Sequence, residues 1–367
     1  MNTKTLQKNP LKELTQFGQS PWYDNIERGL LKNGSLKELI TDYGILGVTT
    51  NPSIFEKAIS NSSLYDSQIR ELARQGKNAL EIYEELAILD VSEAADLFKD
   101  IYFASNRMDG YISIEVLPDF AHDVSKTIDC AKNIFKRINR ENIMIKVPAT
   151  TEGAKAISEL VFQGINVNAT LIFSKPHYEA VAKAYIEGLR QRQEKGLGIL
   201  NIVSVASVFV SRVDTKIDLL LEEQGKSLKG KIALANAKLI YQLFKKIFSP
   251  ENFEDLEKMG GKIQRLLWGS TSTKNPLYSD VKYVEELIAA NTINTIPPET
   301  ICAFKDHGRL RLSLEEGLQE AEKDLKGLQA LGINLNSVCQ EIQHAGVKAF
   351  QDSFDKLISA IKEKSIS

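Results

Sequence analysis

The chain has 367 residues, 43% of them hydrophobic and 26% charged, a composition typical of a globular protein with a substantial core. The formal net charge is −2 and both signs are mixed along the chain, which excludes a broad basic surface, so we expect no nucleic-acid partner. No apolar run approaches the roughly 20 residues that span a bilayer, and the first ten residues lack the apolar core of a signal peptide. We therefore expect a cytoplasmic protein with no membrane partner.

The cysteines and histidines show no ligand pattern. Three cysteines lie far apart, which fits neither a disulfide framework nor a zinc site and indicates a reducing compartment. The four histidines are scattered without the spacing of metal ligands, so we expect no metal.

Short segments rich in β-branched or aromatic residues, bounded by turn residues or charges, recur along the chain and predict strands. They are residues 20–26, 45–51, 111–116, 143–148, 165–172, 202–209, 265–271 and 292–297. Between them, apolar residues spaced three and four apart predict helices over residues 80–101, 120–139, 177–195, 231–248 and 281–290.

This alternation predicts an α/β protein, a (β/α)8 TIM barrel, with a doubly wound open sheet as the alternative. Residues 3–17, 61–76 and 312–364 read as helical additions, the last with a helix end and turn between residues 328 and 332. No low-complexity linker divides the chain, so we expect a single domain, residues 1–367, with helical extensions at both ends.

Nearly every predicted strand carries a polar residue near its carboxyl end, where catalytic groups lie in a barrel of this kind. Because alternate residues of a strand share a face, several of these side chains would point the same way. The residues are Asp24; Thr49 and Asn51; Ser113 and Glu115; Lys146; Asn166, Asn168 and Thr170; Ser207 and Phe209; Ser270 and Thr271, followed by Lys274.

Lys146 stands out because it lies in an apolar, β-branched run, and lysine is almost never fully buried unless it is paired. Removal from water favours the neutral form of an amine, and a neutral amine can attack a carbonyl group to form a Schiff base. The alternative is a strand-end lysine that extends its ammonium group to water.

The other polar residues also have structural interpretations. Asp24 could cap a helix that begins near residue 25, and Asn51 before a proline could belong to a turn. Glu115 could pair with a surface lysine, and Asn168 and Thr170 could satisfy backbone groups at a bulge. Taken together, polar groups at so many strand ends favour an active site.

Three motifs resemble those of transaldolases. Residues 47–55 resemble the second-strand signature of that family, residues 143–150 its Schiff-base lysine segment, and residues 164–174 its fifth strand. Together with residues 274–276 and 303–308, the chain is most similar to the longer bacterial branch, from about residue 9 onward.

The resemblance implies a class I aldolase mechanism on a (β/α)8 barrel, which moves a dihydroxyacetone unit between sugar phosphates in the non-oxidative pentose phosphate pathway. It assigns the Schiff base to Lys146, acid–base catalysis to Asp24, and activation of water to Glu115 and Thr170. It further implies a pocket for the dihydroxyacetone unit that is formed by Asn51, Thr49, Asn168, Ser207 and Phe209.

Arg212 matches the phosphate-binding arginine of the family. A guanidinium group suits phosphate because it can bind two of its oxygens at once. The shorter branch has Pro and Gly where this chain has Val208 and Ser211, and it carries a second arginine after the seventh strand. Here the nearest cation is Lys274, which would bind phosphate as a point charge.

The resemblance implies sugar phosphates as substrates and no cofactor, because an iminium ion supplies the electron sink. One alternative is a fructose 6-phosphate aldolase that releases free dihydroxyacetone, and Glu115 argues against it because the resemblance associates that carboxylate with transfer. The other is a catalytically silent sugar-phosphate-binding barrel. We expect a monomer or a homodimer.

Overall fold

Eight parallel strands pair in chain order and close into a barrel, because β8 returns to β1 in a continuous register from Gln19 opposite Thr292 to Tyr23 opposite Ile296. The computed structural model describes residues 9–366. The predicted barrel is confirmed and the alternative of an open sheet is wrong. The strands are β1 Gln19–Tyr23, β2 Val48–Thr49, β3 Ile112–Glu115, β4 Ile143–Pro148, β5 Val167–Ile172, β6 Ser204–Phe209, β7 Arg265–Gly269 and β8 Thr292–Ile296.

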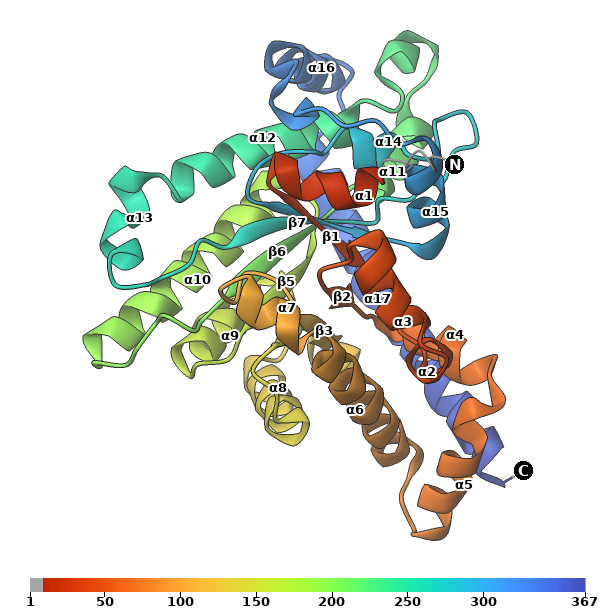
Figure 1. Cartoon of the computed structure of the whole chain (residues 1–367). Helices are drawn as coiled ribbons and strands as arrows, with labels where there is room; N and C mark the ends of the chain where they lie inside the picture. The colour runs from red at the N-terminus through yellow and green to blue at the C-terminus, as the bar shows by residue number, and fades with distance from the viewer. Residues whose placement is uncertain (1–8, 367) are drawn as a thin grey trace, which may run out of the picture.

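The helices surround this barrel (Figure 1). They are α1 Pro10–Glu13, α2 Arg28–Lys32, α3 Ser35–Glu38, α4 Pro52–Ser60, α5 Asp66–Arg74, α6 Ala79–Leu97, α7 Lys99–Ala104, α8 Val124–Ile138, α9 Thr151–Phe162, α10 Lys175–Glu194, α11 Ser211–Leu220, α12 Ile232–Ile247, α13 Pro250–Glu257, α14 Lys282–Glu285, α15 Pro298–His307, α16 Leu318–Ala330 and α17 Leu335–Ile366. Among the described residues, no helix is both long and apolar enough to cross a membrane.

The positions of several helices follow from their capping residues. Asn51, Thr150 and Ser174 each accept a hydrogen bond from a backbone N–H in the first turn of α4, α9 and α10, which ends the preceding strand and starts the helix. Two predicted helices are shorter in the structure. The segment 80–101 divides at Phe98 into α6 and α7, and the segment 281–290 retains only the single turn of α14. The part of the predicted segment 3–17 before residue 9 lies outside the described residues.

The amino-terminal half of the barrel interior is filled. Trp22, Tyr111, Met144, Val205 and Ile293 belong to a buried apolar cluster inside it. Below them, Asp109 accepts hydrogen bonds from Ser20, Trp22 and Arg265, and pairs with the last as a buried salt bridge. The strands are therefore held tightly at one end, and their carboxyl ends are left for a cavity.

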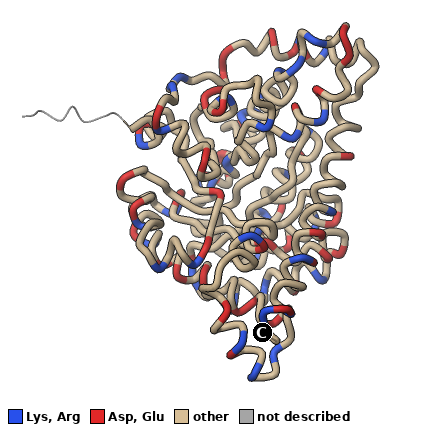
Figure 2. Tube along the Cα trace, turned by 90° about the vertical axis from the view of Figure 1, so that its right-hand side faces the viewer, with Lys and Arg blue, Asp and Glu red and all other residues tan. Residues whose placement is uncertain are grey.

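Helix α17 is the most distinctive addition to the barrel. It follows the predicted turn, where Gly332 takes a left-handed conformation, and runs behind the strands in Figure 1 to end beside α5. Its side chains contact α4, α5 and α6 and the end of β5, so one helix links opposite sides of the barrel mouth. Charged residues of both signs are interspersed over the molecule (Figure 2), as the sequence predicts.

Candidate active site

A cavity of about 540 Å³ lies at the carboxyl ends of the strands. Its lining includes most of the predicted site residues, namely Asp24, Thr49, Asn51, Lys146, Ser207, Phe209, Arg212 and Lys274. Three further residues to which the resemblance assigns a role, Glu115, Asn168 and Thr170, are buried on strands β3 and β5 beside Lys146 and its strand. Of the other polar residues predicted at strand ends, Ser270 lines the cavity, whereas Ser113, Asn166 and Thr271 are buried. The fold thus brings together residues that lie as far apart as 24 and 274 in the chain.

Lys146 is 4% exposed, so the interpretation of a lysine that extends to water is wrong. Its Nζ donates a hydrogen bond of 2.7 Å to the carbonyl oxygen of Thr50, just beyond β2, and lies 3.8 Å from a carboxylate oxygen of Glu115. The amine is therefore fixed at the base of the cavity by one short contact and one longer ionic contact.

Glu115 faces this amine from the neighbouring strand. It is 6% exposed, and burial raises the pKa of its carboxyl group to about 7, against the opposing effect of Lys146. Among the described residues, neither carboxylate oxygen has a hydrogen-bond partner, and the same holds for the buried hydroxyl of Thr170. The proposed pairing of Glu115 with a surface lysine is wrong, because its partner is the buried Lys146.

Asp24 lies directly after β1, where its backbone N–H donates to Ile296 of β8. Its carboxylate accepts a hydrogen bond of 2.6 Å from Thr49, whose hydroxyl also lies 2.6 Å from that of Thr295. Burial raises the pKa of Asp24, while the Thr49 hydrogen bond and the charge of Lys146 lower it. Because α2 begins only at Arg28, the interpretation of Asp24 as a helix cap is wrong.

A chain of polar side chains crosses the barrel beneath the cavity. Ser207 donates to Asn168 at 2.6 Å, and Asn168 in turn donates to Ser113 at 3.1 Å. Asn168 therefore bonds side chains and not backbone groups, contrary to the bulge interpretation. Asn166 does not join them, since it precedes β5 and its side chain bonds backbone atoms of Glu141, Ile143 and Val203.

The turn interpretation of Asn51 is partly right. Its side chain caps α4 by accepting from the N–H of Ile54 at 3.0 Å, and the same residue lines the cavity. A substrate hydroxyl would therefore meet an amide that the helix already holds in one orientation.

Two cations lie on the side of the cavity formed by the segments after β6 and β7. The guanidinium of Arg212 lies over Phe209 at 5.2 Å and over Phe350 at 5.9 Å, and burial lowers its pKa. Among the described residues Arg212 has no carboxylate within salt-bridge distance. Lys274 donates to the hydroxyl of Ser272 at 2.7 Å.

Sequence reasoning missed several residues of this site. The carbonyl of Thr50 and the hydroxyl of Thr295 lie within strands that were predicted, so their place near a strand end was a usable signal. Phe350 on α17 lies in no strand and in no recognised motif, and it reaches the cavity only because α17 crosses the barrel mouth. Its position had no local signal.

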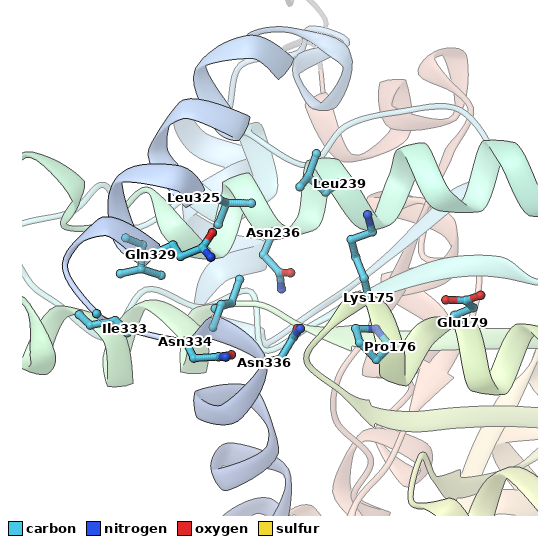
Figure 3. A pocket seen from close by; sticks show the side chains of 13 residues that line it. Lys175, Pro176, Glu179, Asn236, Leu239, Leu325, Gln329, Ile333, Asn334 and Asn336 are labelled. Atoms are coloured by element: carbon cyan, nitrogen blue, oxygen red, sulfur yellow. The ribbon is translucent and has the colours of Figure 1, made fainter.

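A second cavity, of about 680 Å³, lies between α10, α12 and the turn from α16 to α17 (Figure 3). Asn236 from α12 and Asn336 from α17 point into it, and Lys175 begins α10 beside it. None of the predicted site residues lines this cavity. Within residues 9–366, no group of three or more His, Cys, Asp or Glu side chains is placed to hold a metal ion.

A buried amine 3.8 Å from a carboxyl group whose pKa is raised to about 7 is placed to attack a carbonyl group, and that carboxyl group can exchange protons near neutral pH. The fold and site therefore define a (β/α)8 barrel with a buried lysine and ionisable side chains around a cavity at the carboxyl ends of its strands. The model of the transaldolase/fructose-6-phosphate aldolase family matches residues 21–361.

Similar curated proteins bear the same family name. The chain is 43% identical to "Transaldolase 2" of Nostoc sp. (strain PCC 7120 / SAG 25.82 / UTEX 2576), over 97% of each chain. It is 44% identical to a transaldolase of Trichodesmium erythraeum, again over 97% of each chain, and 44% identical to one of Saccharopolyspora erythraea, over 96% of this chain and 97% of that one. The chain belongs to the transaldolase/fructose-6-phosphate aldolase family.

Proposed function

We propose that this protein is a transaldolase, which reversibly transfers a dihydroxyacetone unit from a ketose phosphate to an aldose phosphate. The donor would be sedoheptulose 7-phosphate or fructose 6-phosphate, and the acceptor glyceraldehyde 3-phosphate or erythrose 4-phosphate. The observation that carries the proposal is the buried amine of Lys146 at the base of the cavity. It lies 3.8 Å from Glu115, and Asp24 lines the same cavity.

In the first stage the lysine amine attacks the keto carbon of the donor and forms a carbinolamine, which loses water to give an iminium ion. Glu115 and Thr170 carry buried polar atoms that no described residue satisfies, and they lie on the two strands that flank β4, which carries Lys146. We assign to these two side chains the binding of the water that is exchanged in imine formation. A carboxyl group with a pKa of about 7 can both give and take the proton that this water must exchange.

In the second stage Asp24 takes the proton of the donor hydroxyl next to the bond that breaks. The electron pair of the carbon–carbon bond moves to the iminium nitrogen, the aldose phosphate leaves, and an enamine stays on Lys146. The acceptor aldehyde then enters, its carbon forms the new bond to the enamine, and Asp24 returns the proton to the new hydroxyl. Water adds to the resulting iminium ion in the reverse of the first stage, which breaks the carbon–nitrogen bond and releases the new ketose phosphate and the free amine of Lys146. No oxidant, metal or cofactor is needed to balance these steps.

After the aldose phosphate leaves and before the acceptor enters, the three-carbon unit must stay in place. The chain from Ser207 through Asn168 to Ser113, together with Asn51 and Thr49, offers hydrogen-bonding groups to its hydroxyls. Phe209 supplies an apolar surface, and Arg212 with Lys274 would bind the phosphate of either sugar. We propose the cytoplasm as its location and a monomer or homodimer as its assembly.

Purified protein incubated with fructose 6-phosphate and sodium borohydride should gain a stable three-carbon adduct. Turnover of fructose 6-phosphate should require an aldose phosphate acceptor and should release no free dihydroxyacetone. Release of dihydroxyacetone without an acceptor would show the aldolase activity instead, and absence of both adduct and turnover would indicate a binding protein.

A further inference from the structure

The side chain of Gln343 connects α17 to two strand ends of the active site. It is 4% exposed, and its Nε2 donates one hydrogen bond of 2.9 Å to the carbonyl of Ala149 and another of 2.9 Å to the carbonyl of Leu171. Ala149 directly follows β4, and Leu171 lies near the end of β5. One amide therefore uses both of its protons to bridge the strand that carries Lys146 and the strand that carries Thr170.

The bridged segment of β5 is irregular. The register between β5 and β6 shifts between Ala169 and Ile172, and Leu171 takes a left-handed backbone conformation with φ of 58°. Such a conformation is costly for a leucine and persists only where the surroundings hold it. Gln343 donates a hydrogen bond to the carbonyl of Leu171, so Gln343 is one of the groups that stabilise this backbone conformation.

Thr170, the neighbour of Leu171, is fixed through its backbone. Its carbonyl accepts from the N–H of Ala149 at 2.7 Å, while its own hydroxyl is buried and has no hydrogen-bond partner among the described residues. The position of that hydroxyl therefore depends on the backbone around Thr170. Gln343 bonds the carbonyls of two residues that restrain this backbone: Leu171, the next residue in the chain, and Ala149, whose N–H donates to the Thr170 carbonyl.

The remainder of α17 keeps Gln343 at this place. One turn earlier, Cys339 contacts the carbonyl of Phe173 at 3.1 Å, and one turn later Gly346 packs so closely that an added Cβ would lie 3.1 Å from Leu171. His177 lies 3.5 Å from the same amide nitrogen and belongs to the neighbouring α10. The helix is thus seated directly on the irregular segment.

We propose that Gln343 is a positioning residue for the reaction: by bridging the ends of β4 and β5 from α17, it holds the Thr170 hydroxyl in place for proton transfer with the water of imine formation. This inference rests on the proposed function, because it assigns Gln343 a part in the same site. It touches neither substrate nor reacting atoms, and acts only through the backbone carbonyls of Ala149 and Leu171.

The test is a double-mutant cycle of Gln343→Met with Thr170→Val. Methionine keeps the length of the side chain and removes both donors, so kcat should fall by about tenfold or more, since a misplacement of ~1 Å can cost about a hundredfold. The KM for fructose 6-phosphate should change less than about twofold. In the Thr170→Val background the same substitution should cost almost nothing further, because residues that act through one group are not additive.

Gln340→Met is the matched control, since Gln340 lies on α17 and is exposed; it should leave kcat unchanged. If Gln343→Met does not fold by circular dichroism, Gln343→Asn enters the same cycle, because a shorter amide cannot bridge both carbonyls. Additive losses, or an unchanged kcat in a folded variant, would overturn the inference. The borohydride adduct and the turnover of the wild type are measured in parallel. A wild type without either would contradict the proposed function, whereas an active wild type with an unaffected Gln343 variant would contradict only the inference about Gln343.

Discussion

The Nζ of Lys146 and the Oε2 of Glu115 lie 3.8 Å apart, each on a residue that is almost entirely buried. The separation is too long for a direct hydrogen bond, and Lys146 gives its short contact to the Thr50 carbonyl instead. At this separation the amine lies close to the carboxylate but does not donate a hydrogen bond to it. This arrangement leads to the predictions for Lys146 and Glu115 below.

Lys146→Arg should abolish both the borohydride adduct and turnover while leaving the fold intact. Arginine keeps the positive charge beside Glu115 but does not lose its proton in proteins, so it cannot attack a carbonyl group. Mass spectrometry of the borohydride-treated protein, with circular dichroism as the folding control, checks this. An adduct mapped to a different lysine would contradict the assignment.

Asp24→Asn should retain adduct formation and lose transfer. The proton that Asp24 exchanges belongs to bond cleavage, which follows imine formation, and acid–base catalysis typically contributes about 10²–10⁴-fold. The amide can still accept the hydrogen bond from Thr49, so the local structure should persist. Measured kcat close to that of the wild type would remove Asp24 from the mechanism.

Glu115→Gln should change how stability depends on pH. A carboxyl group whose pKa is raised from 4.5 to about 7 by burial keeps its proton in the folded state while the unfolded state loses it. The wild type should therefore lose stability as pH rises from about 4.5 to about 7, by up to on the order of 3 kcal/mol, and not further above that range. The glutamine variant cannot titrate and should lack this loss.

Urea unfolding of both proteins at a series of pH values between 4 and 8 measures this difference. The free energy of unfolding of the variant, relative to the wild type, should rise across the window and level off at each end. A difference that is constant with pH would mean that Glu115 has its ordinary affinity for protons in the folded protein.

Arg212→Ala should mainly raise the KM for phosphorylated sugars and change little for dihydroxyacetone, which has no phosphate. Loss of a hydrogen bond to a charged group costs about 1.5–3 kcal/mol, or roughly ten- to a hundredfold in affinity. Lys274→Ala should act in the same direction with a smaller size, because an ammonium group offers a point charge and not a two-oxygen fork.

Lys216→Ala, on the same helix as Arg212 but 43% exposed and paired with Glu341, serves as the control and should leave both KM values unchanged. Equal losses for phosphorylated and unphosphorylated substrates in Arg212→Ala would show that this residue supports the packing of Phe209 and Phe350 and does not bind phosphate.

Much of this site could be predicted because alternate residues of a barrel strand point into the barrel, and the carboxyl ends of all the strands lie at the same face. Lys146, Glu115 and Asp24 are polar residues at the ends of β-branched or aromatic segments, and that local pattern suffices to bring them together once the barrel closes. The extents of the elements were less predictable. Strand β2 retains only Val48–Thr49 of the predicted segment 45–51. It ends early because the Asn51 cap begins α4 immediately afterwards.

Other features depend on contacts between distant parts of the chain. The left-handed conformation of Leu171 occurs where this residue packs against α17, and the leucine side chain itself disfavours that conformation. Asn166 lies two residues before Asn168, so the sequence predicts that the two side chains share a face. Asn166 instead precedes β5, and its side chain forms hydrogen bonds with backbone groups. Phe350 and Gln343 reach the site from α17. The amphipathic pattern of this helix predicts that one face is buried but does not predict which part of the barrel that face contacts.

The order of the elements also has a consequence for synthesis of the protein. All eight strands are complete at Ile296, whereas α17 occupies Leu335–Ile366. The chain therefore makes every barrel strand before the helix that supplies the wall formed by Phe350 and the bridge formed by Gln343. Because a domain generally folds as a unit, the surroundings of Lys146 can be completed only after α17 has been made.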